Sequence, residues 1–253
     1  MSLFSLDGRT AIITGSSRGI GRAIAEEYAA HGANVVISSR KAEACQAVAD
    51  EINSRDGGRA IAIAASISEK AELEALVAET RKQLGPVDIC VCNAATNPHY
   101  GSIGEISDDQ FRKILDNNIL SNHWLMQMCL PDMTERGGGA LIVVSSIGGL
   151  RGSPTIGAYN ISKAADFQLA RNYAVEYGRH NVRTNCIAPG LIRTDFAKAL
   201  WQNPEAEKMF NTSHPMRRMG EARDLAGAAV FLASDAAAYV NGQMIVVDGG
   251  STI

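Results

Sequence analysis

The sequence has 253 residues, and its 24 lysines and arginines against 27 aspartates and glutamates leave a formal net charge of −3. This length is enough to bury a sizeable core and suits one large α/β domain. The balanced charge, with no long block of one sign, argues against a nucleic-acid partner or a membrane-surface patch. No run approaches the ~20 apolar residues that span a bilayer, and the N-terminus lacks a signal-peptide pattern.

The five cysteines indicate a reducing compartment. Their number is odd, they are scattered over apolar stretches, and none forms a C-x-x-C pair. Such residues are most often buried thiols rather than disulfides or metal ligands. We therefore expect a cytoplasmic protein without a metal site, whose buried thiols are Cys45, Cys90, Cys92, Cys129 and Cys186.

Short β-branched runs alternate with longer segments of helical period, which is typical of a parallel sheet covered by helices on both faces. The expected strands are 10–14, 34–38, 60–64, 87–91, 140–145, 182–188 and 243–248. The expected helices are 20–31, 42–55, 69–84, 108–129, 158–178 and 224–234. The sequence thus predicts a doubly wound α/β fold with about seven parallel strands. The mixed, loop-like segment 191–213 breaks the rhythm and is expected to form a substrate-binding lid.

Capping residues mark several helix ends. Ser107 and Gln110 have the spacing of a capping box at the start of the helix expected over 108–129. Gly32, Gly85 and Gly178 each follow a helical stretch, where a left-handed C-cap is expected.

The stretch "TGSSRGIG" (14–21) lies between the first strand and the first helix. In such a turn Gly15 allows a tight bend, Gly19 lets the backbone approach a pyrophosphate, and Gly21 lets the helix pack closely on the strand. The helix N-terminus then offers free N–H groups and a positive dipole end to phosphate. The spacing is G-x-x-x-G-x-G rather than the common G-x-G-x-x-G, but its place in a βαβ unit predicts a dinucleotide site.

Tyr159 and Lys163 are four residues apart in "YNISK", so on a helix they project from the same face. An ammonium group near a phenol favours the phenolate and lowers its pKa toward the range useful for acid–base catalysis. Taken alone, this spacing more often belongs to an ordinary surface pair, because Y-x-x-x-K occurs often by chance.

Further motifs follow in a definite order along nearly the whole chain. Together with the glycine turn they resemble those of the classical short-chain dehydrogenases/reductases. They are "CNAA" (92–95), "DNNI" (116–119), "VSSIGG" (144–149), "YNISK" (159–163), "NCIAPGLIRT" (185–194) and "VNGQMIVVDGG" (240–250). The resemblance implies a single Rossmann-type domain over residues 1–253, a nicotinamide cofactor, and hydride transfer to or from a carbonyl or alcohol.

The resemblance also implies the catalytic roles. Tyr159 would be the general acid in carbonyl reduction and the general base in alcohol oxidation. Lys163 would lower the tyrosine pKa and bind the nicotinamide ribose. The resemblance therefore implies that this protein is an enzyme.

Two further catalytic positions each have a neighbour of the same type. Ser146 follows the fifth strand, at the sheet edge where open α/β folds bind ligands, and its hydroxyl could donate to a developing alkoxide. The family's serine-to-tyrosine spacing favours Ser146 over Ser145. The "D-x-N" match favours Asn118 over Asn117 as the residue that completes a proton relay. The alternative for Ser145 and Ser146 is that both serines only cap the end of the fifth strand.

The segment "ISSRK" (37–41) lies where an NAD-specific site places a carboxylate on the ribose 2′-hydroxyl. Ser39 and Arg40 stand there instead, and Arg18 of the glycine turn can approach from the other side. Guanidinium groups bind a 2′-phosphate, which a carboxylate would repel. NADP(H) is therefore expected to be preferred over NAD(H). The alternative is that Arg40 and Lys41 only solvate the next helix.

Two positions depart from the family pattern. Ser66 stands where an aspartate usually holds the adenine amino group, and Ala95 replaces the glycine of "NAG"; alanine is tolerated there if φ is negative. The cofactor contacts that the resemblance implies, beyond those already named, are Ser17, Ile20, Ser66, Asn93, Ala94, Pro189, Gly190, Ile192 and Thr194. Thr194 can alternatively cap the following helix.

The residues expected to line the substrate are mostly apolar, so we expect a small hydrophobic or aromatic ketone or aldehyde. They are Thr96, Asn97, His99, Tyr100, Ile147, Leu150, Arg151, Leu191, Phe196, Leu200, Trp201, Met209 and Phe210. A β-ketoacyl carrier-protein reductase is an alternative, but Arg171, Arg179 and Arg183 are thin evidence for a docking patch. A non-catalytic NADP(H)-binding regulatory protein and an isomerase also remain open.

Family members of this size are usually tetramers, and the same is expected here. The helices over 108–129 and 158–178 carry more apolar side chains than one sheet face needs.

Overall fold

A seven-stranded sheet forms the centre of the structure, and every strand is parallel to its neighbours. The computed structural model describes residues 2–202 and 204–253. The strands are β1 Thr10–Thr14, β2 Asn34–Ser38, β3 Ala60–Ala62, β4 Ile89–Cys92, β5 Gly139–Val144, β6 Val182–Pro189 and β7 Met244–Val247. Their order, β3-β2-β1-β4-β5-β6-β7, reverses between β1 and β4. The doubly wound sheet is confirmed, and this reversal creates the crevice in which such folds bind ligands.

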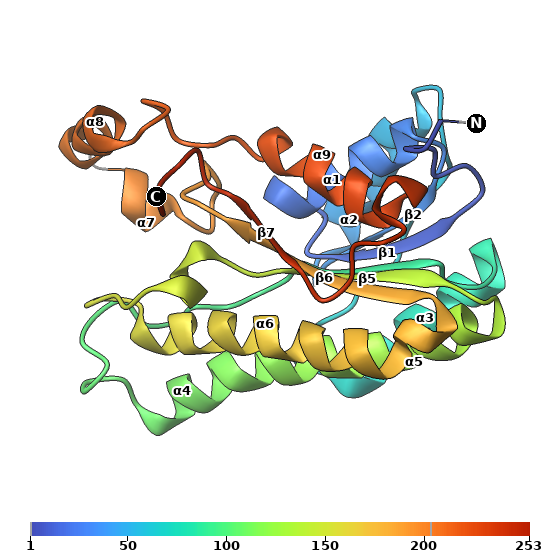
Figure 1. Cartoon of the computed structure of the whole chain (residues 1–253), viewed down its shortest axis with the longest axis horizontal. Coiled ribbons are helices and arrows are strands. Elements are labelled where there is room, and N and C mark those ends of the chain that lie inside the picture. The colour runs from blue at the N-terminus through green and yellow to red at the C-terminus, as the bar shows by residue number, and fades with distance from the viewer. Residues whose placement is uncertain (1, 203) are drawn as a thin grey trace.

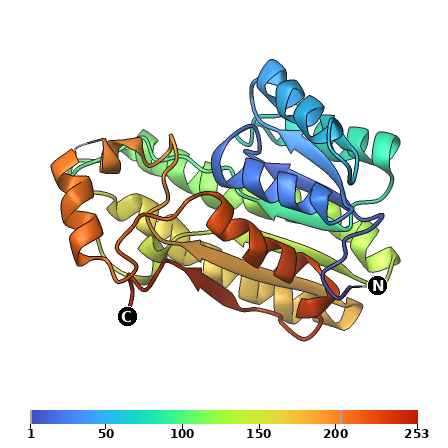
Figure 2. The same ribbon diagram turned by 90° about the horizontal axis from the view of Figure 1, so that it is seen from above.

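Helices cover both faces of the sheet (Figure 1). On one side lie α1 Gly19–Ala30, α2 Ala42–Asn53 and α9 Arg223–Ala233. On the other lie α3 Lys70–Leu84, α4 Asp108–Leu115, α5 Ser121–Glu135 and α6 Gly157–Tyr177. The short helices α7 Lys198–Trp201 and α8 Pro204–Ser213 lie at the end of the molecule where α4 and α6 begin (Figures 1 and 2). Both belong to the segment 191–213.

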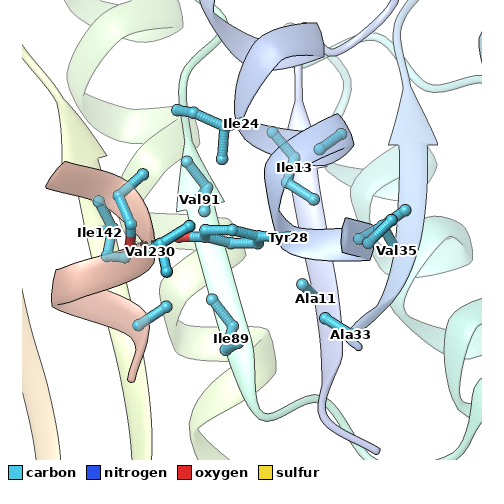
Figure 3. Packing of buried hydrophobic residues seen from close by; sticks show 14 of the residues in the cluster. Ala11, Ile13, Ile24, Tyr28, Ala33, Val35, Ile89, Val91, Ile142 and Val230 are labelled. Carbon is cyan, nitrogen blue, oxygen red and sulfur yellow. Dashed lines mark hydrogen bonds between the residues drawn. The ribbon is translucent and has the colours of Figure 1, made fainter. Parts of the chain in front are cut away.

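Strand side chains alternate between two hydrophobic cores. In β1, Ala11 and Ile13 belong to the core beneath α1 and α9, whereas Ile12 belongs to the core beneath α3 and α5. Tyr28 of α1 is completely buried in the first core and points toward α9 (Figure 3). Its hydroxyl donates a hydrogen bond to the Ala229 carbonyl at 3.0 Å. This side chain therefore joins α1 to α9 on the same face of the sheet.

The helix predicted over 108–129 extends further than expected. Helix α5 continues to Glu135 and contains Pro131. A proline inside a helix removes one hydrogen bond and costs about 3 kcal/mol. The buried side chains of Leu130, just before the proline, and Met133, just after it, belong to the core beneath α3 and α5 and offset the cost.

The same helix is also interrupted. A π-helical turn over Asp116–Leu120 separates α4 from α5. Such turns insert an extra residue and are frequent at functional sites. Asn117 and Asn118 lie in this turn, and both are buried.

The predicted caps hold except at one glycine. The capping box at Ser107 is present, and Gly32 and Gly85 have positive φ, at 93° and 88°. The prediction of a left-handed cap at Gly178 was wrong, because the φ of Gly178 is −57° and the chain continues into a short 3₁₀ turn. The left-handed residue is Asn181, with φ 58°. Asparagine tolerates this conformation, so the turn ends there instead.

Removing the Tyr28 ring is expected to destabilise the fold. Tyr28→Ala should lower the free energy of unfolding by about 3 to 5 kcal/mol, because it leaves a large cavity between α1 and α9. Tyr28→Phe should cost only about 1 kcal/mol, since it removes one hydrogen bond. Denaturant unfolding of both variants measures this; equal losses would show that the ring is not packed as described.

Candidate active site

The glycine turn has the shape of a phosphate cradle. Gly15 and Gly19 have positive φ, 67° and 58°, which glycine adopts without strain. A Cβ on Gly21 would lie 2.5 Å from Nδ2 of Asn93 and 2.6 Å from the Gly15 carbonyl oxygen. Any side chain at Gly21 would therefore push the start of α1 off the strand. All three glycines are required by the backbone, as the motif predicted.

The N-terminus of α1 is open to an anion. Its N-cap residue, Arg18, makes no side-chain capping bond, and the first turn contains no acidic residue. Its free N–H groups and dipole end therefore fit a pyrophosphate. The half-buried Ser17 and Ile20 flank this end. The residues present thus fit the phosphates of a dinucleotide.

Hydrogen bonds from β4 hold the turn in place. The Asn93 side-chain amide donates to the carbonyls of Thr14 at 2.8 Å and Gly15 at 3.3 Å. The Thr14 hydroxyl accepts from the backbone N–H groups of Asn93 and Ala94 at 3.0 and 3.1 Å. Ala95 is not among the described residues with positive φ, so alanine is unstrained there. Thr14 is a supporting residue that the sequence reasoning missed.

Ser16 holds the other side of the turn and was also missed. Its hydroxyl donates to the Ile13 carbonyl at 2.7 Å and accepts from the Ser38 N–H at 2.9 Å. This fixes the glycine turn to the end of β2, directly before Ser39. The only available signal was a small hydroxyl residue inside the motif.

Three side chains are predicted to meet the adenosine ribose and its 2′-phosphate. Arg40 is exposed, and the Ser39 hydroxyl lies 3.1 Å from the Cys45 sulfur. Arg18 Nη1 lies 3.1 Å from Oδ2 of Asp195, in the segment after β6, and both side chains are mostly exposed. An exposed ion pair of this kind stabilises little, so the Arg18 guanidinium is available to a ligand.

The segment after β6 lies over the glycine turn. A Cβ on Gly19 would lie 3.4 Å from Cγ2 of Thr194. Gly190 packs on Asp248, whose Cα would be 2.8 Å from an added Cβ, and Ile192 is buried. This brings the "PGLIRT" segment, starting at Pro189, beside the nucleotide cradle.

Two predicted cofactor contacts have local partners. The Thr194 hydroxyl accepts from the Ala197 N–H at 3.4 Å, which matches its alternative reading as a cap. The Ser66 backbone N–H donates to Glu72 at 2.7 Å, and its hydroxyl accepts from the Ser68 N–H at 3.4 Å.

Tyr159 and Lys163 lie one turn apart on α6. The Lys163 ammonium is 5.7 Å from the centre of the tyrosine ring and only 2% exposed. It donates to the Val144 carbonyl at the end of β5 and to Oδ2 of Asp166, both at 3.0 Å. Lys163 is therefore buried at the carboxyl edge of the sheet and Tyr159 is half-buried, so the two do not form an ordinary surface pair.

The surroundings of Tyr159 affect its pKa in opposite directions. Burial raises the pKa of the phenol, while the Lys163 ammonium and the nearby Ser146 hydroxyl lower it. Asp166 and Tyr100 raise it again, and the net pKa is above its usual value. Lys163 acts in the expected direction, but burial outweighs it.

The two adjacent serines face different partners. The Ser145 hydroxyl donates to the Lys163 backbone carbonyl at 2.8 Å and so joins β5 to α6. The Ser146 hydroxyl accepts from the Gly148 N–H at 3.0 Å and lies near the Tyr159 phenol. The structure therefore brings Ser146, rather than Ser145, together with the tyrosine.

Asn118 joins the loop after β4 to α6. Its side chain accepts from the Thr96 N–H at 2.8 Å and donates to the Thr96 carbonyl and the Ser162 hydroxyl, both at 3.0 Å. Asn117 instead accepts from Ser68 at 2.9 Å, on the α3 side. Only Asn118 is thus directed toward the helix that carries Tyr159.

Aromatic side chains surround the tyrosine. The Phe196 ring centre is 5.9 Å from that of Tyr159, and Phe196 and Tyr100 are both partly exposed. Trp201 donates to the Thr194 carbonyl at 3.0 Å. The side chains of Leu200 and Met209, also predicted to line the substrate, lie outside the described part of the structure.

A dinucleotide cradle, together with a tyrosine beside a buried lysine and a serine, defines a nicotinamide-dependent oxidoreductase. The similarity of this chain to known proteins supports this class. A family model described as "Enoyl-(Acyl carrier protein) reductase" matches residues 15–252. Dehydrogenase/reductase SDR family member 4 of Bos taurus is 40% identical over 249 residues, covering 97% of this chain and 88% of that protein. The chain belongs to the classical short-chain dehydrogenase/reductase family and is an NAD(P)-dependent oxidoreductase of carbonyl or alcohol substrates.

Solved structures share the whole fold. A 7α-hydroxysteroid dehydrogenase complexed with NADH and 7-oxo glycochenodeoxycholic acid is 39% identical with a TM-score of 0.93, covering 98% of this chain and 95% of that one. A gluconate 5-dehydrogenase from Burkholderia cenocepacia J2315 in complex with NADP and tartrate is 32% identical with a TM-score of 0.93, covering 98% and 97%. Because these relatives hold different nucleotides and ligands, arguments about preference must come from residues of this chain.

The cysteines, the possible metal ligands and the helix lengths bear on other kinds of site. All five cysteines are buried and unpaired. Among residues 2–202 and 204–253, no cluster of three or more His, Cys, Asp or Glu side chains is suited to a metal ion. Within the same residues, no helix is both long and apolar enough to cross a membrane.

Substitution of each serine should separate support from chemistry. Ser146→Ala is expected to lower kcat by about 100- to 1,000-fold, because it removes a donor to the reacting oxygen. Ser145→Ala should leave kcat nearly unchanged and lower the free energy of unfolding by about 1 kcal/mol. Steady-state kinetics and denaturant unfolding measure the two effects; a larger loss of kcat for Ser145→Ala would reverse the assignment.

Proposed function

We propose that this protein is an NADPH-dependent reductase of small hydrophobic ketones or aldehydes, with Tyr159 as the proton donor. The observation that carries the proposal is the buried Lys163 ammonium beside the half-buried Tyr159 ring and near Ser146. A non-catalytic nucleotide-binding protein would have no need of a buried lysine beside a tyrosine. The same residues would catalyse alcohol oxidation in reverse.

Each side chain has a separate task in this proposal. The bound cofactor supplies the hydride that reaches the carbonyl carbon. Ser146 donates a hydrogen bond to the carbonyl oxygen and orients it. Tyr159 gives its proton to the same oxygen as charge develops there. The nearby Lys163 ammonium stabilises the tyrosinate that remains, and Asn118 holds the loop after β4 against α6.

The residues around Tyr159 favour an apolar substrate. Phe196 contacts the tyrosine ring, and Tyr100 and Leu150 expose large apolar surfaces. The segment 191–213 carries Phe196 and is proposed as the lid that closes over the substrate. A site lined by such apolar side chains fits a hydrophobic substrate better than a polyol.

A carrier-protein reductase is less well supported. Of the three arginines considered for a docking patch, Arg183 is only 8% exposed. It donates to the carbonyls of Leu232 and Ser234 and so serves the fold. Only Arg171 and Arg179 are left for a basic docking surface.

We also propose that the protein is a cytoplasmic tetramer that uses its long helices as interfaces. Ile161 and Val175 of α6 are exposed at 46% and 86%, and Leu120 before α5 at 37%. Apolar side chains at these positions would be covered by a second copy.

An activity panel with NADPH tests the proposed function. Hydrophobic ketones and aldehydes should be reduced, and Tyr159→Phe should lower the rate by at least about 100-fold, because it removes the proton donor. Quenching of Trp124 and Trp201 fluorescence by NADPH should be unchanged in this variant, which shows that the site is intact. Strict preference for a sugar or a charged keto acid would contradict the substrate class. Turnover near the parent level in Tyr159→Phe would contradict the mechanism.

Nucleotide titrations test the cofactor preference. NADPH should bind at least about tenfold tighter than NADH, or 1.4 kcal/mol, because Arg40 and Arg18 offer positive charge to a 2′-phosphate. Arg40→Ala should weaken NADPH binding and leave NADH binding unchanged, whereas Lys41→Ala is the matched control and should change neither. Equal affinities in the unmodified protein would mean that Arg40 only faces solvent.

A further inference from the structure

A carboxylate is buried behind the tyrosine–lysine pair. Asp166 lies on α6, three residues after Lys163, and its side chain is completely inaccessible to solvent. Its Oδ2 lies 3.0 Å from the Lys163 ammonium. Burying a charge is costly unless it is paired and hydrogen-bonded, so this ion pair needs specific partners.

Helix α5 supplies the second partner. The Asn122 amide donates to Oδ1 of Asp166 at 3.1 Å and to the Asn118 main-chain carbonyl at 2.6 Å. One amide group therefore links the carboxylate to the π-helical turn. Nearby, the Cys186 thiol of β6 donates to the Asp166 main-chain carbonyl at 3.5 Å.

The carboxylate fixes the ammonium. Lys163 has three donors, of which one goes to Val144 and one to Asp166, so its position and direction are set. The charge of Asp166 also opposes the charge that Lys163 presents to Tyr159. A proton leaves the Tyr159–Lys163 pair less readily when a negative charge lies beside it.

We propose that Asp166 is a positioning residue for the Tyr159–Lys163 pair. It holds the ammonium in place and keeps both protons of the pair bound to higher pH, so that the pair remains in its proton-donating form. This inference rests on the proposed role of Tyr159 as proton donor. Asp166 is not itself proposed to touch substrate or cofactor.

The groups that face the pair act in agreement with this arrangement. Burial lowers the pKa of Lys163, but the charges of Asp166 and Tyr159 raise it, and the net pKa lies above its usual value. Burial raises the pKa of Asp166 and Lys163, Asn122 and Ser145 lower it, so that its net pKa lies above the usual value. Two of these groups come from β5 and α5, so the electrostatics are not local to α6.

The remaining groups near the pair act from other elements. Ser146, after β5, lowers the pKa of Tyr159, and Tyr100, in the loop after β4, raises it. Cys186 of β6 raises the pKa of Lys163. None of the three is a carboxylate, so Asp166 is the charge to remove in a test.

Asp166→Asn removes the charge and keeps the shape. Its rate of carbonyl reduction with NADPH should begin to fall at lower pH than in the unmodified enzyme, because the coupled pair loses a proton earlier. On this upper limb, at one fixed pH, kcat/KM should be about tenfold lower. The exposed substitution Asp109→Asn is the matched control and should leave the profile unchanged. A uniform loss of rate at all pH values would contradict the proposal and indicate a merely structural role.

A titration by NMR decides the question without a substrate. Protein labelled at the tyrosine ζ-carbon and lysine ε-carbon, with resonances assigned from Tyr159→Phe and Lys163→Met, reports proton loss from the pair. The midpoint should lie at lower pH in Asp166→Asn, and an unchanged midpoint would overturn the proposal. If no carbonyl is reduced, the proposed function fails, and this titration still tests Asp166.

A last measurement uses the unmodified protein, in case Asp166→Asn does not fold. The carboxyl-carbon resonance of Asp166 should be that of a carboxylate at neutral pH. A protonated Asp166 at neutral pH would carry no charge to oppose Lys163 and would overturn the proposal.

Discussion

The position of the Lys163 ammonium is the constraint on which the site depends. A buried cation loses several kcal/mol of hydration and is tolerated only where hydrogen-bonding partners are fixed. Here the partners are the Val144 carbonyl, at the end of β5, and Asp166. Ser145 adds a second link between β5 and α6. Ser146 and Tyr159 therefore extend from one rigid junction, and their approach is set by the same bonds that bury the lysine.

Most of the fold could be predicted from the sequence, because strands buried on both faces read as continuous apolar runs. All seven expected strands are present, and only their ends differ. The errors lie where packing outweighs local preference. Helix α5 continues through Pro131 because residues beyond it reach the core, and the end of α6 moves its left-handed residue to Asn181. Neither effect is visible in the local sequence.

The candidate site could be predicted only in part, for a related reason. Motifs reveal residues whose chemistry is distinctive, such as a tyrosine and a lysine four apart. They do not reveal a hydrogen bond between Asn122 and Asp166, which are 44 residues apart and meet only after α5 and α6 pack together. Thr14 and Ser16 were missed for the same reason, since their partners lie on β4 and β2.

The π-helical turn before α5 is linked to the buried ion pair. Within Asp116–Leu120 the two asparagines face different elements: Asn117 accepts from Ser68, while Asn118 donates to Ser162. The Asn118 carbonyl accepts from Asn122, four residues later, which in turn holds Asp166. One amide group thus joins the π-helical turn to the buried ion pair. At the pair, burial raises the pKa of the Tyr159 phenol by more than Lys163 lowers it, and the protonated phenol is the form that donates a proton to a carbonyl oxygen.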